Sequence, residues 1–323
     1  MNEKNTIDKV LEIFENGWNK QVILYGPPGT SKTYSATEIA ARFLANRKNE
    51  LHKLKEEGSD EISHEKCEEY LENNESYKVI QFHPSYSYED FVRGIVVKTK
   101  EGTGVPLYEV ERKIIETFGK DAKEDKPRVL VIDEINRAPL GAVLGELIYG
   151  LEYRGKAVST PYVYIENGVE SPLKISEHLY IIGTMNTADR SIGSMDYAVR
   201  RRFAFVPVLP KPNVIKETWN NEKVGEKAKE LFEALMNEKK GIFAIDMLAD
   251  DSIDVNDIKI GHTYFLGKKD KNDNVDSKTE FEYLRYRIDY QIRPVYEEYI
   301  KDGLIDRSGL DRFNKIVEKT FQI

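Results

Sequence analysis

The sequence predicts an α/β fold, with helices on both faces of a mainly parallel sheet and a smaller helical domain after it. Short apolar runs alternate with helical segments up to about residue 210, as in a three-layer α/β domain. Beyond Pro210-Lys211-Pro212 the pattern becomes mostly helical, broken by a polar loop over 267–279. We therefore expect an α/β domain over 1–210 and a helical domain over 211–323.

The individual elements follow from the spacing of apolar residues. Ile7, Val10, Leu11 and Phe14 recur at helical spacing, whereas Gln21-Val22-Ile23-Leu24-Tyr25 is a continuous run typical of a buried strand. Residues 46–77 are very polar and predict a charged helical insertion on the surface. A loop is expected over 98–106. Further strands are expected over 79–82, 129–132 and 179–184, and helices over 7–18, 32–45, 108–118, 140–151 and 195–201.

Composition limits the class of protein. Of the 323 residues, 40% are hydrophobic and 11% aromatic, enough for a sizeable core. A net charge of -8, from 48 basic and 56 acidic residues, argues against a chain that wraps nucleic acid by itself. A single cysteine, Cys67, excludes an internal disulfide framework. With neither a long apolar run nor the residue order of a signal peptide, we expect a cytoplasmic protein with no membrane partner.

One glycine-rich loop has the pattern of a phosphate-binding loop. Gly26-Pro27-Pro28-Gly29-Thr30-Ser31-Lys32-Thr33 follows an expected strand and opens an expected helix. In such a loop, backbone amides and the helix N-terminus face the phosphates, Lys32 neutralises their charge, and Thr33 coordinates Mg²⁺. Ser31 is a departure, because glycine is usual before the lysine.

The strand expected over 129–132 ends in two carboxylates. Downstream of a phosphate loop, this pattern predicts that Asp133 belongs to the Mg²⁺ shell and that Glu134 is the base for the attacking water. Two further polar features, at Asn186 and at 200–202, have a purely structural interpretation as well as the catalytic one that is given below. Asn186 follows the apolar strand over 179–184 and could cap the next turn. The run Arg200-Arg201-Arg202 could complement a helix dipole.

Several motifs together resemble the McrB family of AAA+ proteins. They are Gln81-Phe82-His83-Pro84-Ser85-Tyr86-Ser87-Tyr88-Glu89-Asp90-Phe91, Asp133-Glu134-Ile135-Asn136-Arg137-Ala138, Met185-Asn186-Thr187-Ala188-Asp189-Arg190-Ser191, Gly261-His262-Thr263-Tyr264-Phe265 and Ile292-Arg293-Pro294-Val295-Tyr296-Glu297-Glu298-Tyr299. The similarity extends over roughly residues 20–300, and the motif at 185–191 is the most distinctive. It implies an AAA+ P-loop fold whose helical domain is a lid.

The resemblance also implies a function. A member of this family is expected to be a GTPase, with ATP as the alternative substrate, that forms a hexameric ring. It drives a separate McrC-type endonuclease in modification-dependent DNA restriction, and DNA is bound through the assembled complex. Catalytic roles are implied for Asn136, Asn186, Asp189 and Arg190. Asn186 would be the residue that orients the water, and Arg200 or Arg201 would be a finger that reaches the neighbouring subunit's nucleotide.

Two rival functions remain open. MoxR-like chaperone ATPases share the element at 133–138, although the motif at 185–191 favours McrB. A nucleotide-locked, non-enzymatic scaffold in a defence complex is the second rival, with Ser31 slowing turnover. The triplet Glu111-Arg112-Lys113 is of a kind that nucleases use, but in a chain that is 32% charged it is expected by chance. We therefore do not expect this chain to be a nuclease.

Overall fold

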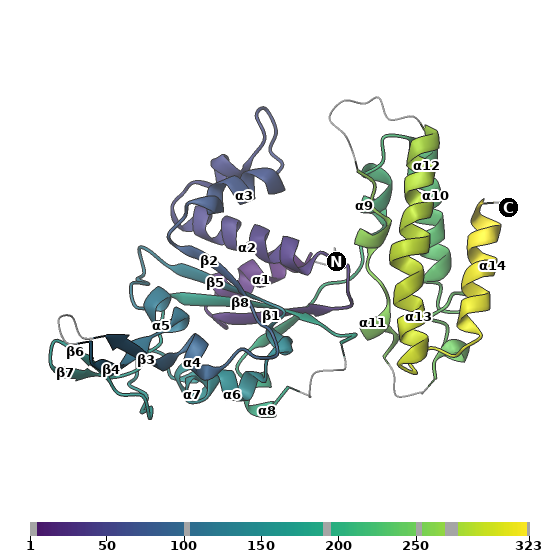
Figure 1. Ribbon diagram of the computed structural model, residues 1–323. Coiled ribbons are helices and arrows are strands. Elements are labelled where there is room, and N and C mark those ends of the chain that lie inside the picture. The colour runs from purple at the N-terminus through teal and green to yellow at the C-terminus, as the bar shows by residue number, and fades with distance from the viewer. Residues whose placement is uncertain (1–4, 100–103, 190–194, 250–253, 269–276, 322–323) are drawn as a thin grey trace. The chain divides into compact units, whose positions relative to one another are not determined.

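The computed structural model describes residues 5–99, 104–189, 195–249, 254–268 and 277–321. The chain divides into two compact units. The first contains Met1–Tyr25 and Lys32–Pro207, and the second contains Gly26–Ser31 and Val208–Ile323. Six residues of the glycine-rich loop are therefore grouped with the C-terminal part of the chain. Figure 1 shows the elements of both units.

The first unit is built on a five-stranded sheet in the order β2-β5-β8-β1-β9. The strands are parallel in the three pairs β2 with β5, β5 with β8, and β1 with β9. The strand bounds are β1 Gln21–Gly26, β2 Tyr77–Gln81, β5 Arg128–Asp133, β8 Leu179–Asn186 and β9 Ala204–Pro207. The predicted α/β fold class with a parallel-sheet core is thus confirmed.

Helices cover both faces of this sheet (Figure 1). Along β5, Leu130 and Ile132 pack into the core that also holds residues of α5, α6 and α7. On the opposite face, Tyr180 of β8 packs edge-on against Phe14 of α1 and tilted against Phe43 of α2. The helices are α1 Thr6–Glu15, α2 Lys32–Arg47, α3 His64–Glu72, α4 Tyr88–Phe91, α5 Ile114–Gly119, α6 Leu140–Leu144, α7 Leu147–Glu152 and α8 Tyr197–Arg200, with 3₁₀ turns at Leu51–Leu54 and Ile135–Arg137.

The polar segment over 46–77 forms a 3₁₀ turn and then α3, which contacts α2. Cys67 and Leu71 are buried on α3, so one side of this charged segment is packed rather than solvated. Burial raises the pKa of the Cys67 thiol to about 12, which keeps the thiol protonated.

The prediction of a helix over 108–118 was wrong for residues 108–112, and residues 98, 99 and 106 of the loop expected over 98–106 lie in strands. β3 Arg93–Thr99 and β4 Pro106–Arg112 form an antiparallel hairpin, and the helix is limited to α5. In β4, Tyr108 and Val110 alternate with Glu109 and Glu111, which is the two-residue period of a strand, and β3 carries the continuous apolar run Ile95-Val96-Val97. The β-branched and aromatic side chains on this hairpin also favour a strand over a helix.

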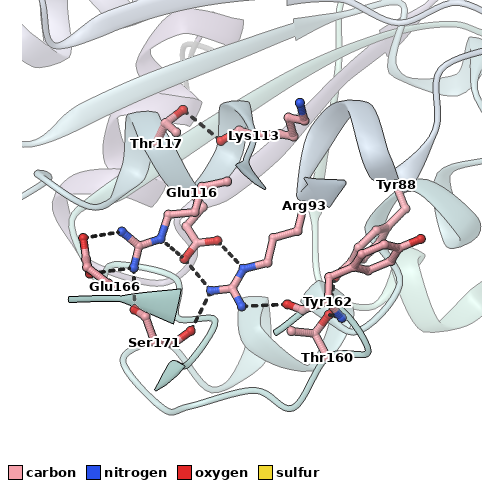
Figure 2. A network of polar contacts seen from close by, with 10 residues as sticks. Tyr88, Arg93, Lys113, Glu116, Thr117, Thr160, Tyr162, Glu166 and Ser171 are labelled. Atoms are coloured by element: carbon pink, nitrogen blue, oxygen red, sulfur yellow. Dashed lines mark hydrogen bonds and ion pairs between the residues drawn. The ribbon is translucent and has the colours of Figure 1, made fainter. Parts of the chain in front are cut away.

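A buried ion-pair network joins this hairpin to its neighbours (Figure 2). Arg93 is 1% exposed and makes two hydrogen bonds of 2.7 Å to the Glu116 carboxylate of α5. The same guanidinium donates to the carbonyls of Tyr162 and Ser171, 3.0 Å each. Arg112 lies 2.8 Å from Glu116 through its Nε. The network therefore fixes β3 and β4 against the small hairpin of β6 Tyr164–Glu166 and β7 Val169–Ser171.

The expected helix over 140–151 is divided in two. Gly145 lies between α6 and α7 with a φ of +48°, a left-handed backbone that a helix interior does not tolerate. The strands β6, β7 and β9 were not predicted, because each is only three or four residues long.

The second unit is mainly helical. It contains α9 Pro212–Glu217, α10 Glu222–Leu235, α11 Val255–Ile258, α12 Ser277–Arg287, a π-helical turn at Ile288–Ile292, α13 Arg293–Lys301 and α14 Gly309–Phe321, with 3₁₀ turns at Ile245–Met247 and His262–Phe265. Across the described parts of both units, none of the helices combines the length and the apolar character that a membrane crossing requires.

Candidate functional site

A chain of hydrogen bonds lies at the carboxyl ends of β5 and β8 in the first unit. Asp133 Oδ1 accepts from the Thr33 hydroxyl at 2.8 Å and from the Thr184 hydroxyl at 2.6 Å. Thr33 is in the first turn of α2, and Thr184 is near the end of β8. The parallel register, which pairs Ile132 with Gly183, brings these strand ends together. Residues distant in sequence thus meet around one carboxylate oxygen.

Glu134 occupies a strained and partly desolvated position beside Asp133. Its backbone is left-handed, with φ +52° and ψ +45°, which is uncommon for a residue with a side chain. The Thr184 hydroxyl accepts the Glu134 N–H at 3.1 Å, and Asn186 Nδ2 donates to Glu134 Oε1. Burial raises the pKa of Glu134, and nearby Arg137 opposes this shift. A carboxylate with a raised pKa is a better proton acceptor.

The other predicted residues of the motifs at 133–138 and 185–191 lie partly around this carboxylate. Asn136 Nδ2 donates to the Asn186 carbonyl at 3.2 Å. Arg137 Nε lies 3.8 Å both from Glu134 Oε2 and from Asp189 Oδ2, which connects Asp189 with the site. Arg190 lies outside the described residues.

Two buried oxygen atoms at the site are left without a hydrogen bond. Within the described parts of the chain, Glu134 Oε2 and Asn136 Oδ1 are buried and have no hydrogen-bonding partner. A buried acceptor without a donor is costly. These two atoms therefore suit a site whose polar occupant, such as water or nucleotide, supplies the missing donors.

Lys32 begins α2 and is only 7% exposed. Burial lowers the pKa of its ammonium group to about 8, although Glu134 and Asp133 oppose this shift. A buried cation beside two carboxylates is suited to a highly charged anion, because the anion returns the electrostatic stabilisation that water no longer provides.

The loop before Lys32 adopts a special backbone. Ser31 has a φ of +66°, the left-handed conformation that favours glycine. Its hydroxyl lies 3.1 Å from His262 Nε2. Thr30 is 1% exposed, and its hydroxyl donates to the Pro27 carbonyl at 3.1 Å. The left-handed backbone of Ser31 thus occurs together with a side-chain contact to His262.

The three arginines at 200–202 have different environments. Arg202 donates to the Ala198 carbonyl at 2.8 Å and also pairs with Glu152, so it holds its own helix. Arg201 is mostly exposed and lies 3.5 Å from the same Glu152 carboxylate. Arg200 is exposed, with its guanidinium 5.1 Å from the Phe205 ring centre. Arg202 is thus committed to an internal role, unlike the other two.

Two residues around Asp133 and Glu134 were missed by the sequence analysis. Thr184 was treated as an ordinary strand residue, although it contacts both Asp133 and Glu134. A hydroxyl placed two residues before Asn186, at the polar end of an apolar strand, was the available signal. Arg137 was seen as part of a motif but was given no role.

The oxygen atoms of Asp133 and Thr33 are suitable ligands for a magnesium ion. Mg²⁺ prefers hard oxygen ligands and is commonly held by one or two protein oxygens together with phosphate and water. The Thr33 hydroxyl and the Asp133 carboxylate already share a hydrogen bond of 2.8 Å, so both oxygens converge on one point. These two residues would hold the ion.

The fold and this site define a P-loop protein of the AAA class, and comparison with known families agrees. The model of the AAA domain (dynein-related subfamily) matches residues 21–203. The chain therefore belongs to the AAA family of nucleotide hydrolases.

Within this class, the chain is similar to the type IV methyl-directed restriction enzyme EcoKMcrB subunit of Escherichia coli K12. The two are 32% identical over 287 residues, covering 88% of this chain and 54% of that subunit. The expected resemblance to McrB is confirmed, and the chain spans about half the length of this curated relative. Among solved structures, an ATPase candidate from Cytophaga hutchinsonii is 14% identical. That match covers 70% of this chain and 58% of the other, with a TM-score of 0.35.

Proposed function

We propose that this chain is a nucleoside triphosphatase, with GTP preferred, and the motor subunit of a modification-dependent DNA restriction complex. The observation that carries the proposal is the cluster at the strand ends, where Thr33 and Thr184 both donate to Asp133, and Asn186 donates to Glu134. This is the set of groups that phosphoryl transfer to water needs: a metal-binding pair, a base and a residue that positions the water.

In this proposal each group has one role. The loop 26–31 and Lys32 bind the triphosphate. Thr33 and Asp133 hold Mg²⁺, which, when bound, neutralises charge on the phosphate oxygens. Glu134 Oε2 accepts the proton of the attacking water, while the bond from Asn186 keeps the carboxylate in place. We assign Asn136, Asp189 and Arg190 to support of this carboxylate and its surroundings.

The preference for GTP is supported by the resemblance to McrB. The test is a steady-state comparison of GTP and ATP hydrolysis by the purified chain, with Mg²⁺ present. We expect a kcat/KM for GTP at least about tenfold above that for ATP, which corresponds to roughly 1.4 kcal/mol of discrimination. Equal or faster ATP hydrolysis would favour a MoxR-like remodelling ATPase. No turnover with either nucleotide, despite binding, would favour the scaffold function.

We also propose that the chain acts as a hexameric ring, with the helical part at 211–323 as a lid on the nucleotide-binding domain at 1–210. The exposed Arg200 and Arg201 support an active site completed by a neighbouring subunit. Heterologous contacts of this kind close into rings. A cytoplasmic location fits this role.

An McrC-type endonuclease is the partner that we propose, and DNA would be engaged through the assembled complex. The loop that follows Asn186 is a suitable coupling element, because Asp189 connects through Arg137 to Glu134. A partner that moves this loop would change kcat more than KM. Turnover should rise severalfold when an McrC-type endonuclease subunit is added, and Asp189→Ala should reduce that increase. Binding without any change in turnover would contradict the coupling.

A further inference from the structure

The segment 261–263 contacts the glycine-rich loop through its main chain, within the second unit. The Gly261 N–H donates to the Pro28 carbonyl at 2.8 Å, and the Thr263 N–H donates to the Gly29 carbonyl at 3.0 Å. The approach is so close that a Cβ on Gly261 would lie 1.8 Å from the Gly29 carbonyl oxygen. Only glycine therefore fits at position 261.

These two bonds determine which way the loop amides point. In a trans peptide the C=O and N–H groups point in opposite directions, and none of the described peptide bonds is cis. Because the Pro28 and Gly29 carbonyls both point toward 261–263, the N–H groups of Gly29 and Thr30 both point away from it. Successive amides on one side form a concave anion-binding nest.

His262 supports the next residue of the loop through its side chain. The imidazole is 3% exposed, and its Nδ1 accepts the Lys211 N–H at 3.2 Å. Burial, helped by Lys211, lowers the pKa of His262 to about 4, so the ring is neutral at neutral pH. A neutral ring that accepts at Nδ1 carries its proton on Nε2. His262 Nε2 therefore donates to the Ser31 hydroxyl at 3.1 Å.

We propose that Gly261-His262-Thr263 is a positioning element of the phosphate loop. Its main chain orients the Gly29 and Thr30 amides toward the phosphates, and His262 holds Ser31 in the left-handed conformation that glycine would adopt unaided. The proposal rests on the nucleotide-binding function given above. It explains how a chain with serine at this position keeps a phosphate-binding loop, and it gives His262 a role in affinity without direct contact with the substrate.

The test is a double-mutant cycle on nucleotide affinity, measured by titration with a fluorescent GTP analogue in the presence of Mg²⁺. His262→Asn cannot reach Ser31 and should raise the Kd about tenfold, the typical effect of one lost hydrogen bond. His262→Gln places a donor at nearly the reach of Nε2 and should stay within roughly threefold of the wild type. Ser31→Gly should bind at least as tightly as wild type, because glycine tolerates the left-handed backbone. In the Ser31→Gly background, His262→Asn should have almost no effect.

The main-chain contact between 261–263 and the glycine-rich loop is tested by a separate variant. Gly261→Ala should abolish tight binding, and Ser31→Gly should not rescue it, because the clash is with the Gly29 carbonyl. The exposed His52→Ala is the matched control and should leave the Kd unchanged. Melting curves of each variant separate loss of affinity from loss of folding, and the histidine cycle does not depend on the glycine variant.

Two results would overturn the proposal. If His262→Asn raised the Kd equally in the wild-type and Ser31→Gly backgrounds, His262 would not act by supporting Ser31. If Gly261→Ala bound nucleotide with wild-type affinity, the main chain at 261–263 would not be what orients the loop amides. Wild-type chain that binds no nucleotide would instead contradict the proposed function, and this role with it.

Discussion

Asn186 donates a hydrogen bond from its side-chain amide to the carboxylate of Glu134, the residue directly after the Mg²⁺-binding candidate Asp133. The two side chains come from neighbouring parallel strands, β8 and the end of β5. One carboxylate oxygen of Glu134 is thereby fixed, and the other is left for the chemistry.

This relationship predicts the effect of changing Asn186. Asn186→Asp places a second carboxylate against Glu134, and a like charge raises the pKa of its neighbour. Glu134 works as a base only when ionised, so the acid limb of the kcat profile should move to higher pH. Asn186→Ala should lower kcat by roughly 10- to 100-fold, with KM nearly unchanged. An acid limb at the wild-type position in Asn186→Asp would show that the contact does not matter for catalysis.

Lys32 predicts how nucleotide binding depends on pH. Its pKa is lowered to about 8 by burial, so the ammonium group is charged below that pH and loses its proton above it. The dissociation constant should be flat from pH 6 to about 7.5. It should then rise by up to tenfold per pH unit above 8, because binding must be accompanied by proton uptake. Calorimetry above pH 8 in buffers of different ionisation enthalpy would detect that uptake. Its absence would contradict the lowered pKa.

The arginines predict cooperation between subunits. Arg200→Ala should lower kcat by about 10³-fold if this residue is the trans finger, whereas the exposed Arg307→Ala should have no effect. Arg201→Ala tests the alternative, because Arg201 is held only loosely by Glu152. A chain carrying both Arg200→Ala and Arg201→Ala, mixed with Lys32→Ala, should regain activity where an intact pocket meets an intact finger. Co-assembly without recovery would argue against a finger from this helix.

The buried network at Arg93 predicts a stability effect. Arg93→Ala leaves Glu116 buried and partly unpaired, which should lower the free energy of unfolding by about 3–5 kcal/mol. Lys98→Ala is the matched control. It also removes two ion-pair contacts, to Glu109 and Glu111, but these are exposed and should contribute little to the free energy of unfolding. Urea unfolding of both variants measures the difference, and similar losses would mean that the network is not stabilising.

Features of the fold and site that depend on neighbouring residues in the sequence were predicted, whereas those that depend on contacts between distant residues were not. The strand, loop and helix around Lys32, and the apolar strand before Asp133, were predicted because their signals are local. In the hairpin, β3 was not predicted and most of β4 was assigned to a helix, because the strand pattern is short and interrupted by charge. The contact between Ser31 and His262 spans 231 positions, and only the folded chain brings it together. Thr184 was missed for a related reason, because its role depends on the register between β5 and β8.

The central claim, that Glu134 is the base of a nucleotide-hydrolysing site, is tested most directly by Glu134→Gln. Glutamine keeps the size of the side chain and its contact with Asn186 but cannot accept a proton from water. We expect the GTP dissociation constant to stay within about threefold of wild type while single-turnover hydrolysis falls by a factor on the order of 10² or more. Hydrolysis by Glu134→Gln at close to the wild-type rate would contradict the account.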